Sequence, residues 1–172
     1  MPSPKMRRRY IIDCEVYPNY FLLAGLDIDN DDVVYYEYAD RDAIRDFMMG
    51  NTTISFNGLD YDLPILAHAI SANSTLASIK QLSDQIVKSK NPSWMICREM
   101  DLHVPRGWNH IDLIKVAPGV GSLKIYGARL HQQRLQDLPI EPDTVLTEQQ
   151  MQDIRHYCVN DLRTTLSLLN AL

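Results

Sequence analysis

Long apolar runs, internal repeats and low-complexity segments are all missing from this chain of 172 residues. No apolar stretch approaches the ~20 residues that a membrane-spanning helix needs, so we expect no membrane span and no membrane partner. The basic residues near the N-terminus are soon followed by acidic ones, which is unlike a secretory signal peptide. The length and the typical hydrophobic and charged content favour one ordinary globular domain over residues 1–172.

Cysteine is also scarce, and positive charge is outnumbered by negative charge. The three cysteines, Cys14, Cys97 and Cys158, show no metal-type spacing, and their odd number argues against a disulfide framework. We therefore expect a reducing, cytoplasmic location, which would be the host cytoplasm if the protein is viral. The formal net charge of -5 argues against broad electrostatic binding of duplex nucleic acid. It still allows a site in which metal ions supply the local positive charge.

Periodicity and turn residues predict an α/β fold with a mixed sheet. Strands are expected over residues 8–16, 19–28, 33–38, 52–56 and 109–116. Helices are expected over residues 40–49, 61–72, 74–90, 121–133 and from 147 to the end. The first three strands follow each other closely enough for an antiparallel meander. Residues 91–107 contain two prolines and a glycine, and are expected to be irregular.

The stretch Tyr10–Val16 combines an apolar, β-branched lead-in with two carboxylates two residues apart. On a strand, Asp13 and Glu15 would project from one face and Cys14 from the other. Two like charges at this spacing raise each other's pKa unless a cation neutralises them, and a divalent ion with oxygen ligands commonly does so. The alternative is that the strand ends at Ile12 and that both acids are solvated.

Two later segments carry acids at the ends of predicted elements. Asp62 stands at the start of a helix, and Asn57 at the end of the strand before it. An Asx turn and a helix-capping aspartate would explain both residues without any function. In the last helix Tyr157 and Asp161 are four residues apart, so they share one face. An aspartate on an apolar face is costly unless it is paired or metal-bound, although Asp161 could lie on the polar border instead.

Considered together, these segments would bring four carboxylates to one cleft, which is what two divalent ions ~4 Å apart require. Ile12–Glu15, Phe56–Pro64 and Tyr157–Asp161 resemble, in this order, the three motifs of the DEDD (DnaQ-like) superfamily of 3′–5′ exonucleases. The residues of these motifs are similar to those of the tyrosine subclass, and to those of the proofreading domains of phage-type DNA polymerases. The motifs extend from residue 11 to residue 161, so the resemblance covers nearly the whole chain. It implies a ribonuclease-H-like fold, with a five-stranded mixed sheet flanked by helices.

The resemblance also implies phosphodiester hydrolysis with two divalent cations, Mg²⁺ or Mn²⁺, which suit an all-oxygen site. Asp13, Glu15 and Asp161 would hold the ion that activates water. Asp13 and Asp62 would help to hold the second ion, which stabilises the leaving 3′ oxygen. Tyr157 would orient the attacking water by a hydrogen bond, because a phenol with a reference pKa of about 10 is no strong base near neutral pH.

Two of these assignments have competitors. His156 stands five residues before Asp161, which is the spacing of the histidine subclass. Tyr157 matches the third motif as the polymerase domains have it, so Tyr157 is preferred as the residue that orients the water. Asp60 competes with Asp62, but Asp62 matches the motif, and we expect Asp60 to be solvated.

Substrate contacts are implied at further positions. The resemblance places Asn57 and Tyr61 beside the terminal nucleotides, with the tyrosine ring available for stacking. Three cations on the predicted helix that follows Gly121, or directly after it, could either meet phosphate or form a solvated helix face: Lys124, Arg129 and Arg134. Asp112 could line the same cleft, but a hydrogen bond at the strand end is preferred. His68, His103, His110 and His131 show no zinc spacing and are expected to be structural or surface residues.

The implied substrate is the 3′ end of single-stranded DNA, and the implied partner is a DNA polymerase, in cis or in trans, during proofreading in replication. One alternative is an RNA 3′–5′ exonuclease. The residues of the second motif resemble those of phage-type DNA polymerases, which favours DNA. The other is a module that grips a nucleic-acid end or a polymerase without cutting, and the presence of all four acids argues against it.

Overall fold

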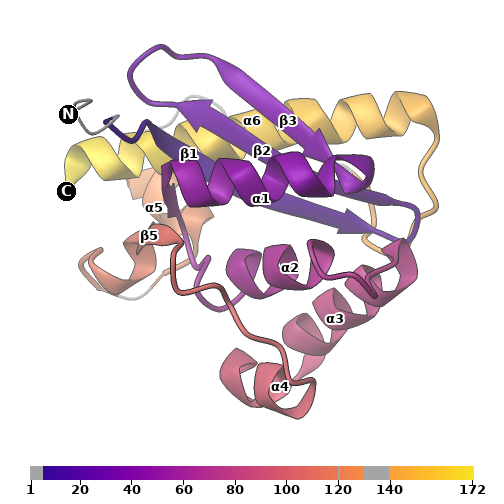
Figure 1. Cartoon of the computed structure of the whole chain (residues 1–172). Coiled ribbons are helices and arrows are strands. Elements are labelled where there is room, and N and C mark those ends of the chain that lie inside the picture. The colour runs from indigo at the N-terminus through magenta and orange to yellow at the C-terminus, as the bar shows by residue number, and fades with distance from the viewer. Residues whose placement is uncertain (1–5, 120, 130–139) are drawn as a thin grey trace, which may run out of the picture.

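The centre of the molecule is a mixed sheet with the strand order β3-β2-β1-β4-β5, shown in the computed structural model of Figure 1. The structure describes residues 6–119, 121–129 and 140–172. The strands are β1 (Arg9–Tyr17), β2 (Tyr20–Asp27), β3 (Val33–Glu37), β4 (Thr52–Ser55) and β5 (Asn109–Asp112). The α-helices are α1 (Arg41–Gly50), α2 (Asp62–Ala69), α3 (Leu76–Lys88), α4 (Ser93–Glu99), α5 (Leu123–Arg129) and α6 (Glu148–Ala171). Two 3₁₀ turns, η1 (Tyr38–Asp40) and η2 (Leu113–Lys115), follow β3 and β5.

The sheet confirms the predicted fold class and is consistent with a ribonuclease-H-like layout. β1 pairs with β2 and β2 with β3 in antiparallel fashion, whereas β1 pairs with β4 and β4 with β5 in parallel. Every residue of β2 is buried, because helices cover both faces of the sheet at this strand. β1 lies in the middle of the sheet, so the side chains at its carboxyl end are surrounded by other elements.

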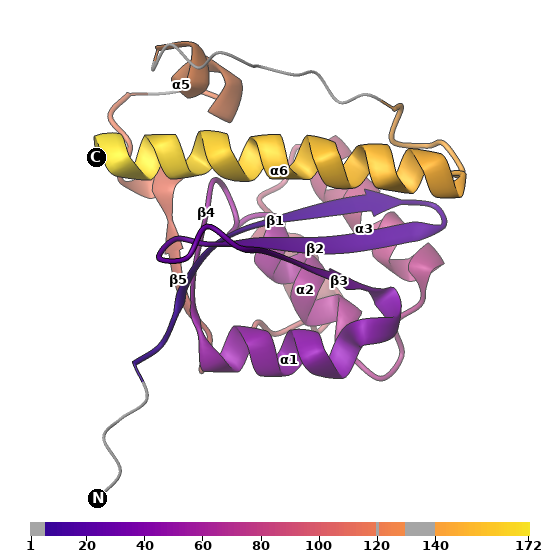
Figure 2. The same ribbon diagram turned by 90° about the horizontal axis from the view of Figure 1, so that it is seen from above.

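Alternation along β1 divides the interior into two cores. Tyr10 and Ile12 belong to the core under α1, α2 and α3, together with residues such as Phe47 on α1. Ile11 and Tyr17 belong to the core under α6, together with residues such as Leu162. Figure 2 shows this sandwich, with α6 along one face of the sheet and α1, α2 and α3 on the other. Odd-numbered residues of β1 therefore face α6.

The long helix α6 begins in the way that the sequence predicts. The Thr147 side chain accepts a hydrogen bond from the Gln150 backbone N–H, and the Gln150 side chain accepts one from the Thr147 N–H, which forms a capping box. The helix then runs over β1 and β2 as 24 residues. No helix in the described part of the chain is long and apolar enough to cross a membrane.

Two predictions of secondary structure were wrong in detail. The segment over residues 91–107 contains α4, a short helix that begins directly after Pro92. Proline is tolerated at a helix start, where its missing N–H costs nothing. Pro92 therefore precedes a helix and does not interrupt one. β5 ends at Asp112 and not at Val116, because the Asp112 side chain accepts a hydrogen bond from the Ile114 N–H and turns the chain into η2. Most of the second half of the helix expected over residues 121–133 lies outside the described residues.

Candidate metal centre

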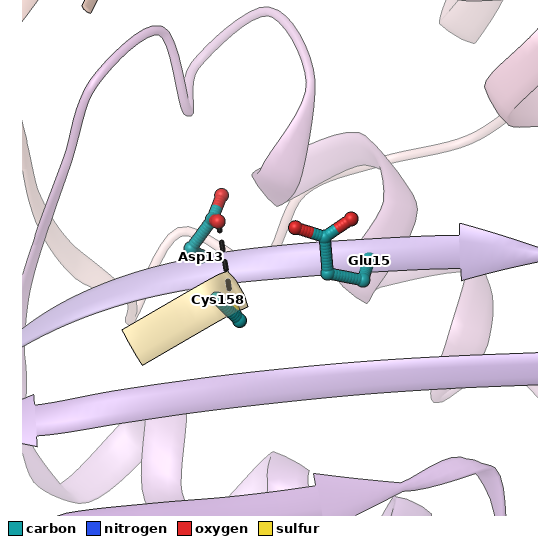
Figure 3. A group of neighbouring side chains, drawn as sticks. All are labelled: Asp13, Glu15 and Cys158. Atoms are coloured by element: carbon teal, nitrogen blue, oxygen red, sulfur yellow. Dashed lines mark hydrogen bonds between the residues drawn. The ribbon is translucent and has the colours of Figure 1, made fainter. Parts of the chain in front are cut away.

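Asp13 and Glu15 project from the carboxyl half of β1 toward the side of the sheet that α6 covers, and both are half-buried. Figure 3 shows their carboxylates side by side above the strand, with Cys158 reaching toward Asp13 from α6. The Cys158 thiol donates a hydrogen bond of 3.5 Å to Asp13 Oδ2. One potential ligand atom from each of these three residues lies within 4.8 Å of the other two. The strand thus brings its two carboxylates together as the D-x-E spacing predicts.

Asp62 reaches the same strand from the other core. It is the first residue of α2 and is only 2% exposed. Its Oδ1 accepts a hydrogen bond of 2.9 Å from the backbone N–H of Cys14, the residue between Asp13 and Glu15. Asp62 is therefore no solvated helix cap, because its side chain is directed at β1.

Asp161 and Tyr157 come from the middle of α6, one turn apart. Tyr157 is buried, Asp161 is half-buried and His156 is exposed. The Tyr157 pKa is raised by burial and then by the charges of Asp161 and Glu15. The tyrosine thus lies among the acids, whereas the competing histidine lies on the outer surface of the helix.

Burial is the first cause of a raised pKa at each of the four carboxyls. It raises the pKa of Glu15 to about 8, that of Asp62 to about 7 and that of Asp161 to about 6. The pKa of Asp13 is raised well above its usual value by burial and then by the charges of the other three acids. Among the described residues, Asp62 and Asp161 do not belong to the close group of Asp13, Glu15 and Cys158. The charge of each nevertheless raises the pKa of both Asp13 and Glu15. The four groups therefore form one electrostatic cluster.

One positive charge close to Asp161 comes from α5. Burial raises the pKa of Asp161, and the charge of Lys124 offsets part of this rise, so this lysine lies beside the site and not on a remote helix face. The side chain of Arg129 and the whole of Arg134 lie outside the described residues. The pKa values of the four carboxyls stay raised because burial is their main cause.

The loop between β4 and α2 is held by Asp112. Its carboxylate accepts hydrogen bonds from the backbone N–H groups of Asn57 (2.7 Å), Leu59 (3.0 Å) and Ile114 (3.1 Å). Asn57 has a positive φ of 65°, a left-handed conformation that asparagine tolerates better than most residues. The preferred expectation for Asp112, a hydrogen bond at the strand end, is confirmed.

Two neighbouring residues on this loop lie in different surroundings. Tyr61 donates to or accepts from Ser83 Oγ at 2.7 Å and lines a cavity of about 220 Å³ together with Glu15. Asp60 is partly exposed, accepts a hydrogen bond from Ser93 and pairs with Lys115, so it is tied to other elements and not simply solvated. Stacking of a nucleotide on Tyr61 stays a prediction.

The described histidines have structural surroundings. His110 lies between the hydroxyl groups of Thr53 and Ser55, and His68 is hydrogen-bonded to Ser78. His103 is exposed and pairs with Asp101. His131 lies outside the described residues.

Cys158 is the member of the cluster that sequence reasoning did not assign to the site. Its spacing contained a signal, because Cys158 is three residues before Asp161 and so shares a helical face with it. Burial raises the Cys158 pKa well above its usual value, and the charge of Asp13 adds to the effect. The thiol is thus a neutral hydrogen-bond donor to Asp13.

The donor set fits hard divalent cations. Four carboxylates offer the oxygen ligands that Mg²⁺ and Mn²⁺ prefer, and the described histidines lie in surroundings of their own. Comparisons of the chain with protein-family models, with curated proteins and with solved structures return no match. Any functional conclusion therefore depends on the motifs and on the geometry described above.

Proposed function

We propose that this protein is a metal-dependent 3′–5′ exonuclease of the DEDD type, which hydrolyses phosphodiester bonds at the 3′ end of single-stranded DNA. One observation carries the proposal: Asp13, Glu15, Asp62 and Asp161 come from β1, α2 and α6 to form one cluster with raised pKa values. Burying several carboxylates together is unfavourable for folding alone, so a binding role is the better explanation.

The carboxylates would hold two divalent cations, Mg²⁺ or Mn²⁺. Asp13, Glu15 and Asp161 are assigned to one ion, and Asp13 and Asp62 to the other. When bound, such ions supply Lewis-acid stabilisation of charge on the phosphate and lower the pKa of water. The half-buried positions of Asp13 and Glu15 leave the carboxylates accessible to an ion from the solvent.

Tyr157 is assigned to the attacking water. Tyr157 precedes Asp161 by one turn of α6, and the lone pairs of its phenol oxygen can accept a proton of the water. Because burial raises the tyrosine pKa, the phenol stays protonated and positions the water without taking its proton.

Substrate binding is assigned to Asn57, Tyr61 and Lys124. Asn57 lies on the loop held by Asp112, and Tyr61 lines the cavity beside Glu15. Lys124 lies near Asp161, where an ammonium group would attract a phosphate. A DNA polymerase, in cis or in trans, is the partner that such an activity would serve.

The proposal is tested with oligonucleotides labelled at the 3′ or the 5′ end, in magnesium, in manganese and in EDTA. We expect the 3′ label to be released first as mononucleotide, only in the presence of metal, and not by the Asp13→Ala, Glu15→Ala double variant. His156→Ala is the matched control on α6 and should cut normally. Binding without release would favour the non-catalytic module, and faster hydrolysis of matched RNA would favour the RNA exonuclease.

A further inference from the structure

We infer that a second pocket, beside α4, binds a nucleotide unit of the same single DNA strand, away from the carboxylates. The pocket has a volume of about 670 Å³, within the range of ligand sites. Its lining includes Trp94, Arg98 and Arg106, together with Leu59 and Asp60. We call it the α4 pocket. The inference rests on the proposed function, because that function supplies the strand.

The α4 pocket joins an exposed aromatic ring to positive charge. Trp94 is 58% exposed, although a large apolar side chain is normally covered. The guanidinium group of Arg98 lies over the Trp94 ring, 5.4 Å from its centroid. A flat ring beside a guanidinium group is the pairing that holds a base by stacking and its phosphate by charge.

The charges of the pocket are available to an anion. In the part of the chain that the structure describes, neither Arg98 nor Arg106 forms an ion pair. The acid in the lining, Asp60, already pairs with Lys115 and accepts a hydrogen bond from Ser93. His103 also lines the pocket, but it pairs with Asp101 and adds no unpaired charge. In a protein with a formal net charge of -5, two unpaired arginines in one cavity favour a polyanion.

The same loop borders this pocket and the candidate metal centre. Leu59 and Asp60 line the α4 pocket, whereas Tyr61 lines the cavity that contains Glu15. Asp62 follows directly. Figure 1 shows α4 beside α3, and Pro64 of α2, two residues after Asp62, lines the same pocket. A strand whose 3′ end enters the metal centre would therefore pass this loop and reach the pocket with a more distant nucleotide.

Intrinsic fluorescence tests the inference without requiring catalysis. The chain has two tryptophans, of which Trp108 is buried and Trp94 is exposed. We expect a short oligothymidylate, added in EDTA, to quench the wild-type emission, because a base stacks on Trp94. Trp94→Phe should abolish the quenching, and Arg98→Ala should weaken binding about 10-fold. Arg7→Ala, which removes an equal charge from a residue outside the pocket, should bind as the wild type does.

Alkylation of Cys97 gives an independent measurement. Cys97 lines the α4 pocket and is partly exposed, whereas Cys14 and Cys158 are buried. The oligonucleotide should slow the reaction of Cys97 with N-ethylmaleimide in the wild type, but not in Arg98→Ala. Absence of both quenching and protection would overturn the inference, as would equal quenching by polyglutamate, which would indicate an acidic protein segment. The quenching experiment needs no metal, so it can detect binding in the α4 pocket even if the protein does not hydrolyse DNA. Failure of the α4 pocket and failure of the proposed exonuclease activity can therefore be told apart.

Discussion

Asp112 holds the loop between β4 and α2 through its carboxylate. Its buried carboxylate accepts hydrogen bonds from two backbone N–H groups of the loop that carries Asn57. It touches no group that we assign to chemistry, so it acts as a positioning residue. Its role depends on the pairing of β5 with β4, which brings Asp112 opposite Ser55.

Replacing Asp112 by alanine should leave these N–H groups without acceptors and lower the free energy of unfolding by roughly 1–3 kcal/mol. Urea unfolding measures this loss. A displaced loop should also raise KM more than it lowers kcat at a temperature where the variant is fully folded. Asp112→Asn keeps one acceptor oxygen and should restore part of both properties. An unchanged KM would show that Asp112 is only structural.

Tyr157 and His156 allow a sharp comparison between adjacent residues. Tyr157→Phe keeps the buried ring and removes the hydroxyl, so folding should be retained while kcat falls on the order of 100-fold. His156→Ala changes an exposed residue and should leave the rate unchanged. Thermal unfolding of both variants controls for stability. A larger loss of rate in the histidine variant would reverse the assignment.

The sequence could predict which acids meet, but not every side chain between them. The spacing of Asp13 and Glu15 on a strand, and of Tyr157 and Asp161 on a helix, follows from backbone periodicity alone. The contact between Cys158 and Asp13 spans 145 residues and depends on how α6 is rotated over β1. That rotation is set by packing of the core under α6, which no local pattern specifies.

Close packing constrains the turn from β4 into α2 at Gly58. A Cβ added to Gly58 would lie 1.9 Å from Ser55 Oγ and 2.9 Å from His110 Nε2. Gly58 therefore has to be glycine because of a close approach, and the adjacent Asn57 is held by the Asp112 carboxylate.

Gly58→Ala should force Ser55 and His110 apart and destabilise the fold by about 1–3 kcal/mol, measured by urea unfolding. Activity should fall as well, because the loop carries Asn57. Gly50→Ala is the matched control: a Cβ there meets nothing within 4 Å. Alanine at this helical position should be neutral or stabilising by roughly 0.5–1 kcal/mol. Equal stability of the two variants would contradict the steric explanation.

Helix α4 shows the limit of reading elements from local signals. Pro92, Pro105 and Gly107 suggest an irregular segment, yet seven residues between them are helical. Buried Ile96 packs into the core under α1, α2 and α3, and Ser93 donates to Asp60. These tertiary contacts stabilise a helix that is too short to form alone.

For the whole molecule, the acidic cluster predicts an unusual dependence of stability on pH. Burial raises the pKa of Asp62 to about 7 and that of Glu15 to about 8, so the folded chain binds more protons than the unfolded chain at intermediate pH. The stabilising contribution is complete below the ordinary carboxyl range and is lost as the pH rises through these values. For each proton that the folded chain binds and the unfolded chain does not, the free energy of unfolding falls by about 1.4 kcal/mol per pH unit.

Urea unfolding in EDTA should therefore show stability falling from about pH 5 to about pH 9, with a smaller fall in Glu15→Gln. Mg²⁺ should restore stability at the alkaline end, because it binds the charged carboxylates of the folded chain. A metal-free protein that gains stability over this range would contradict the electrostatic description of the site.

The most direct test of the central claim is diffraction at the manganese absorption edge from crystals soaked in Mn²⁺. We predict anomalous peaks among the carboxylates of Asp13, Glu15, Asp62 and Asp161, and their loss in Asp13→Asn crystals. Peaks found only elsewhere on the molecule, or none at a saturating concentration of manganese, would contradict the claim that these four acids form a metal centre.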